Sequence, residues 1–137
     1  MKKTYLTDGH RTYHGCAMSL PTQYASIAAW QEEQHVINNR KLYFEKFSQV
    51  QALLSDHWSL QLPQAGFNFW ARTPVNDELF TKLLYQKTNI TVLPGSYLSR
   101  KINGIDPGKN YVRMAMVPPL ADCIEAAKRI RHFVSCL

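Results

Sequence analysis

The chain has 137 residues, of which 45% are hydrophobic and 12% aromatic, a composition that favours one folded domain over a disordered chain. No run approaches the roughly 18 to 20 apolar residues of a membrane span, and the basic N-terminus lacks the apolar segment of a signal peptide. The net charge of +6 permits an anionic partner, but the basic residues are scattered, so nucleic-acid binding is not predicted.

Two helices are predicted in the first half of the chain. Ser19 can cap a helix that has Pro21 in its first turn and then carries Tyr24, Ile27 and Trp30. A longer helix follows and is expected to fade near His57. Its apolar residues recur at intervals of three and four: Val36, Tyr43, Phe47, Val50 and Leu54.

The second half of the chain is predicted to form a small sheet with helices. Alternation predicts a strand over residues 66–72, and turn signals then predict a helix over 76–89 and a short strand over 90–93. A further strand is expected over 111–117, followed by a helix opened by Pro118-Pro119. The predicted class is α+β, a two-layer arrangement of about three mostly antiparallel strands covered by helices, in the order α-α-β-α-β-β-α. The aromatic residues of the first strand are expected in the core: Phe67, Phe69 and Trp70.

Metal binding and disulfide bonding are not predicted. Cys16, Cys123 and Cys136 have unrelated spacings, so we expect buried thiols in a reducing, cytoplasmic setting. His10 and His14 have the spacing of a helical metal pair, but glycines flank them and no third ligand is evident.

Arg113 is the candidate binding residue, because it lies within the otherwise apolar strand 111–117. Burying a guanidinium is costly unless an anion meets it, and its planar fork suits a carboxylate or a phosphate. The alternative is an edge-strand arginine that reaches water or a surface carboxylate. A long loop between Pro94 and Gly108, rich in glycine and proline, leads into this strand. Long loops between short strands more often have a function than serve only as connections.

Several segments resemble one enzyme family. Residues 66–70, 90–96 and 108–115 resemble the C-terminal third of class I/II aminotransferases, which are fold type I enzymes that use pyridoxal 5'-phosphate. Residues 11–18 and 27–30 look most like the succinyldiaminopimelate aminotransferase branch, which belongs to lysine biosynthesis. The resemblance implies that Arg113 grips the α-carboxylate of the substrate.

The resemblance also implies partners and further contacts. The substrates would be an amino acid, with N-succinyl-diaminopimelate a candidate, and a 2-oxo acid. Tyr13 and His14 would contact the substrate or the cofactor phosphate of a neighbouring subunit, although ordinary packing of these side chains is the alternative. Gly95 and Ser96 are further candidates for contacts with the substrate or with the cofactor of a neighbouring subunit, and the loop from Pro94 to Gly108 would border the entrance.

The departures from the family pattern limit what the chain can do. Nothing in it matches the lysine segment that binds the cofactor covalently or the acidic partner of the pyridine nitrogen, so no catalytic residue is assigned. We therefore expect a C-terminal portion of such an enzyme, inactive alone, with pyridoxal 5'-phosphate belonging to the complete enzyme and not bound by this chain by itself.

The expected division of the chain into domains follows from the same resemblance. Residues 1–33 would border the large domain, and residues 34–137 would form the small domain. The helix with Tyr24 and Trp30 would leave an apolar face that favours homo-oligomers. The alternative function is a free-standing domain that binds a small carboxylate or dimerises as a regulatory module.

Overall fold

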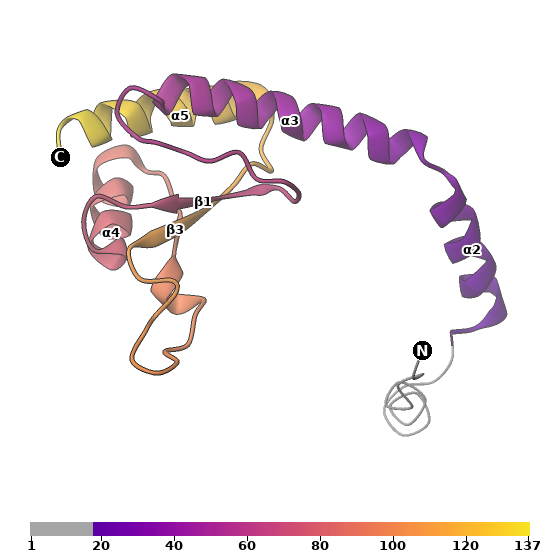
Figure 1. The fold of residues 1–137 in the computed structure, drawn as a ribbon. Coiled ribbons are helices and arrows are strands. Elements are labelled where there is room, and N and C mark those ends of the chain that lie inside the picture. The colour runs from indigo at the N-terminus through magenta and orange to yellow at the C-terminus, as the bar shows by residue number, and fades with distance from the viewer. Residues whose placement is uncertain (1–17) are drawn as a thin grey trace. The chain divides into compact units, whose positions relative to one another are not determined.

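The computed structural model describes residues 18–137. In chain order its elements are α2 (Leu20–Gln31), α3 (Gln34–Leu54), β1 (Asn68–Arg72), α4 (Asp77–Thr88), β2 (Leu93–Pro94), the 3-10 helix η1 (Gly95–Tyr97), β3 (Tyr111–Ala115) and α5 (Leu120–Ser135). This order confirms the predicted α+β class (Figure 1). The chain divides into two compact units after Asn38, so α2 belongs to the first unit and the sheet with its helices to the second.

The sheet is antiparallel, and β3 is its central strand. The strand order is β1-β3-β2, with Trp70 of β1 and Leu93 of β2 both opposite Arg113 of β3. The short strand predicted over 90–93 is displaced, because only Leu93–Pro94 pairs with β3. The preceding segment diverges from β3 around a cavity of about 140 Å³, and Val92 and Met114 line that cavity.

The core lies on one face of the sheet. β1 and β3 alternate between buried and exposed residues, as a half-buried strand requires. Figure 1 shows α5 alongside the second half of α3, with β1 and β3 beneath them. The buried cluster combines side chains from three helices and the sheet: Phe47, Val50 and Leu54 of α3, Phe80 and Leu84 of α4, Ala127, Ile130 and Phe133 of α5, and Phe69, Val112 and Met114 of the strands. Among residues 18–137, the helices therefore cover this face of the sheet and leave the other face open.

The boundaries of α4 follow from its end residues. The Asn76 side chain accepts hydrogen bonds from the N–H groups of Glu78 and Leu79, each at 3.1 Å. At the other end Asn89 takes a left-handed conformation, with φ of 57°, and its N–H donates to the Tyr85 carbonyl at 2.9 Å. Both ends match the prediction, because asparagine suits an N-cap and tolerates a positive φ.

Three burial predictions need correction. Phe69 lies in the core, but Trp70 is 42% exposed because alternation places it on the open sheet face. Phe67 precedes the strand and is also exposed, with its ring 6.2 Å from that of Tyr43. Cys123 is buried as expected, whereas Cys136 is exposed because it follows the end of α5.

In the first unit, no residue of α2 is buried, and Trp30 is 82% exposed. Among residues 18–137, none of the helices is both long enough and apolar enough to cross a bilayer.

Candidate carboxylate-binding site

Arg113 lies on the open face of the sheet, in the middle of its central strand. Of the two interpretations that the sequence left open, burial is wrong, because Arg113 is exposed, and it reaches the surface from the central strand and not from an edge strand. The physical reason is that α3, α4 and α5 all pack on the opposite face. Within residues 18–137, Arg113 makes no ion pair and no side-chain hydrogen bond, so its five N–H donors are open to a ligand.

A stacked aromatic pair lies next to Arg113. The rings of Trp70 and Tyr111 are parallel to within 8°, with centroids 5.6 Å apart. Trp70 is directly opposite Arg113 in the register, and Tyr111 is two residues before it on β3. This pair was not assigned to the site from the sequence, although strand alternation already places both residues on the face of Arg113.

The loop that leads into β3 is held by close backbone packing. A Cβ atom on Gly95 would overlap the Gly108 carbonyl oxygen and would stand 2.9 Å from the Trp70 ring. Within the same loop Asp106 accepts hydrogen bonds from the Ser99 hydroxyl and, at 3.0 Å, from the Gly108 N–H. Glycine is required at Gly95 because the two ends of the loop meet there, which brings η1 against the start of β3.

Asp77 joins this loop to α4. Its carboxylate is fully buried and accepts hydrogen bonds from the Ser96 N–H at 2.9 Å and the Asn110 N–H at 3.2 Å. Burial acts to raise the pKa of Asp77, but the hydrogen bonds from Ser96 and Asn110 outweigh it and hold that pKa below its ordinary value. The Asp77 carboxylate thus holds three parts of the chain together: the first turn of α4, η1 and the start of β3.

The structure brings some of the predicted site residues together and leaves others out. Gly95 and Ser96 lie at the turn beside β3, and the structure gives both a role in holding the loop. Tyr13 and His14 fall outside the described residues, as does His10. In residues 18–137, no group of three or more His, Cys, Asp or Glu side chains could hold a metal ion.

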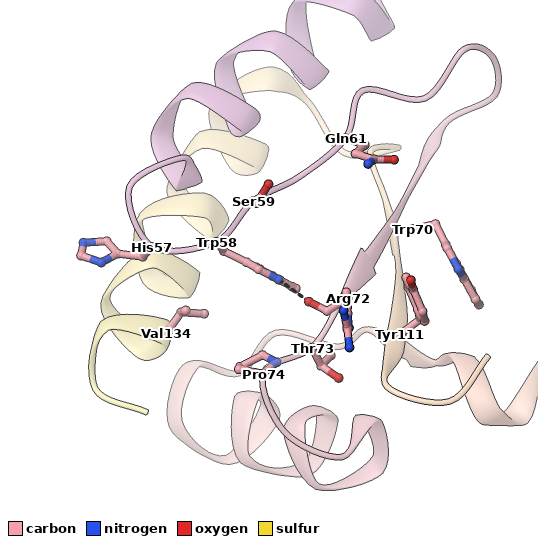
Figure 2. Close-up of a pocket in the computed structure, with 10 residues that line it drawn as sticks. All are labelled: His57, Trp58, Ser59, Gln61, Trp70, Arg72, Thr73, Pro74, Tyr111 and Val134. Carbon is pink, nitrogen blue, oxygen red and sulfur yellow. Dashed lines mark hydrogen bonds between the residues drawn. The ribbon is translucent and has the colours of Figure 1, made fainter. Parts of the chain in front are cut away.

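A groove of about 600 Å³ borders the aromatic pair. Trp70 and Tyr111 line one part of it, and Trp58, Arg72 and Thr73 line another. Figure 2 shows Arg72 between Trp58 and Tyr111, with the Trp58 indole N–H donating to the Arg72 carbonyl at 2.6 Å. Aromatic rings and accessible polar side chains therefore line the surface from β3 to the edge of the sheet at β1.

No family model matches the chain. The similar proteins described next are all aminotransferases. An aminotransferase from Neisseria meningitidis is 46% identical, with a TM-score of 0.86 over 94% of this chain and 34% of its own. A probable N-succinyldiaminopimelate aminotransferase from Thermus thermophilus is 33% identical, with a TM-score of 0.61 over 74% of this chain and 26% of its own. The LL-diaminopimelate aminotransferase of Syntrophobacter fumaroxidans is 28% identical over 113 residues, which are 80% of this chain and 28% of that enzyme.

The fold and these relatives define a class of protein. The chain is homologous to pyridoxal-phosphate-dependent aminotransferases of fold type I. It corresponds to their C-terminal small-domain region and spans about a third of the length of the relatives that it matches.

The open face of the sheet lacks the groups that pyridoxal 5'-phosphate needs. The cofactor needs a lysine amine for its aldehyde and an acidic partner for its ring nitrogen. The outward-facing residues of the three strands include neither: Asn68, Trp70, Arg72, Leu93, Tyr111, Arg113 and Ala115. The buried carboxylate of Asp77 is engaged by Ser96 and Asn110. This face offers cations and aromatic rings, which suit an anionic ligand.

Proposed function

We propose that this chain is the substrate-carboxylate-binding portion of a pyridoxal-phosphate-dependent aminotransferase. Arg113 carries the proposal, because it presents an open guanidinium at the centre of a sheet face that holds no acidic residue. A guanidinium can hold a carboxylate through two parallel hydrogen bonds. Homology to aminotransferases, whose substrates carry an α-carboxylate, supports this ligand.

The open face explains how this binding could be strong in a complete enzyme. Exposed ion pairs contribute little, because water screens them and the side chains lose entropy. A second domain placed over the sheet would exclude water and strengthen the contact between Arg113 and the substrate. In this proposal the chain supplies substrate binding, and the cofactor chemistry belongs to residues outside it.

The same proposal covers the domain bounds, the oligomeric state, the residues at the substrate entrance and the amino donor. Residues 34–137 act as the small domain, residues 1–33 border the large domain, and the exposed side chains of α2 contribute to homo-oligomers. Gly95 and Ser96 lie at the border of the substrate entrance, with Tyr13 and His14 near the site of a neighbouring subunit. N-succinyl-diaminopimelate is the candidate amino donor, in line with the description of the Thermus thermophilus relative.

A chimaera tests this function. The segment of the Neisseria meningitidis aminotransferase that matches this chain is replaced by the corresponding residues of this chain, and transfer of an amino group to a 2-oxo acid is assayed. We expect the chimaera to bind the cofactor and to transaminate, and the 137-residue chain alone to do neither.

Two results would contradict the proposal. One is a folded chimaera that binds the cofactor but does not transaminate. The other is micromolar binding of 2-oxo acids by the chain alone, which would support a free-standing carboxylate-binding domain. The parental Neisseria meningitidis enzyme is the positive control.

A further inference from the structure

A second arginine shares the open sheet face with Arg113. Arg72 is the last residue of β1, is exposed, and lies directly opposite Tyr111 in the register. Arg113 lies directly opposite Trp70, so the two arginines occupy one diagonal of a four-residue square. The stacked rings of Trp70 and Tyr111 occupy the other. Diagonal neighbours on paired strands are about 7–8 Å apart, within reach of long side chains.

Neither arginine has a carboxylate partner in the part of the chain that the structure describes. The ion pairs found there join Glu32 with His35, Glu125 with Arg129, and Asp56 with Arg131. The side chain of Arg72 makes no hydrogen bond with a described residue, and only its backbone carbonyl is used, by Trp58. Two like charges on one face repel each other, and an anion that met both would remove that repulsion.

A groove that Arg72 lines gives room for one end of such an anion, and Arg113 is not among the residues that line it. Its volume is about 600 Å³, and Trp70 and Tyr111 form part of its wall. Ser59 and Gln61 also line it, and both are exposed. Figure 2 shows Gln61 and Ser59 on the same side of Arg72, above it in that view. The groove therefore combines a cation with aromatic and neutral polar groups, a surface suited to the polar tail of a small anion.

We propose that Arg72 determines specificity by holding a second, distal carboxylate of the ligand whose first carboxylate binds Arg113. The inference rests on the proposed function of Arg113 and adds a substrate class to it: dicarboxylates, in which the chain between the two groups passes over the Trp70–Tyr111 pair. Monocarboxylates use Arg113 alone and gain nothing from Arg72.

The test is a titration of the full 137-residue chain at fixed ionic strength, followed by the NMR shifts of backbone amides in β1 and β3 and of the Trp70 indole N–H. The probes are acetate and the dicarboxylates from succinate to pimelate. We expect the best dicarboxylate to bind about three- to fivefold more tightly than acetate, as one additional exposed ion pair allows. Arg72→Ala should abolish this gain and leave the acetate affinity unchanged.

Two control variants make the outcome specific. Arg40→Ala removes one positive charge from an exposed position on α3 and should leave both affinities unchanged. Arg72→Lys keeps the charge without the planar fork and should retain part of the gain. Equal dicarboxylate affinity in the wild type and Arg72→Ala would overturn the inference, as would equal loss in Arg40→Ala.

The design also separates this inference from the proposed function. Acetate binding that does not depend on Arg113 would contradict the carboxylate site itself. Acetate binding that depends on Arg113, with no gain for any dicarboxylate, would overturn only the role of Arg72.

Discussion

Arg113→Ala in the active chimaera is expected to lower kcat/KM for the amino acid by roughly 10²- to 10³-fold, because a charge-assisted, two-point hydrogen bond in a closed site is worth about 3–4 kcal/mol. Most of the loss should appear in KM. The carboxylate keeps its charge throughout the reaction, so the contact stabilises the bound substrate and the transition state alike.

The cofactor provides an internal control for this variant. The sheet face around Arg113 does not fit pyridoxal 5'-phosphate, so the absorbance of the bound cofactor should not change. Arg113→Lys should recover part of the affinity, because it restores the charge but not the fork. Arg129→Ala removes an exposed arginine that pairs with Glu125 on α5 and should leave KM unaltered. An amino-acid KM that is the same with and without Arg113 would contradict the assignment.

Asp77→Ala is expected to destabilise the chain by about 3–4 kcal/mol, because it leaves the N–H groups of Ser96 and Asn110 without their acceptor in a buried place, at roughly 1–3 kcal/mol each. Asp77→Asn retains one carbonyl oxygen and should cost less. Glu78→Ala removes the neighbouring, exposed carboxylate from the same helix turn and should cost at most about 1 kcal/mol. Urea unfolding of the full chain gives these free energies.

Hydrogen exchange locates the effect of Asp77→Ala. If Asp77 fixes the loop, the amides of Ser96 and Asn110 should lose protection in this variant while those of α5 keep theirs. Unfolding free energies that are equal in Asp77→Ala and Glu78→Ala would show that the buried carboxylate does not stabilise the loop.

The same carboxylate predicts a pH dependence. Because the pKa of Asp77 is lower in the folded chain than its ordinary value of 3.8, its stabilising contribution is complete above about pH 4 and is lost as the pH falls through the folded pKa. The difference in unfolding free energy between the wild type and Asp77→Asn should therefore shrink in acid. A difference that stayed constant there would contradict the lowered pKa.

Local signals in the sequence predicted the elements well. The ends of α4 follow from Asn76 and Asn89, whose side chains and backbone act over a few residues. Strand alternation placed Arg113 opposite the buried residues Val112 and Met114. These features depend on neighbours in the chain, so a single sequence contains them.

The features that depend on distant contacts were missed. Alternation separates two strand faces but does not tell which face the helices cover, so the burial of Arg113 was left open and Trp70 was assigned to the core. Asp77 looked like an ordinary residue at a helix start, because its partners Ser96 and Asn110 follow 19 and 33 residues later. The sequence alone could not show that Arg72 lies on the same sheet face beside Arg113, because this placement depends on the register of β1 on β3.

The proposed function is tested most directly by measuring whether Arg113 binds a carboxylate. Acetate is added to the labelled full chain, with chloride at equal ionic strength as the control, and the amide shifts of β3 and the Trp70 indole shift are measured. We expect shifts that grow with acetate concentration, with a Kd on the order of several hundred millimolar in the wild type, as one exposed ion pair allows, and their loss in Arg113→Ala but not in Arg40→Ala. Unchanged shifts in the wild type, or the same binding curve in Arg113→Ala, would contradict the proposed function.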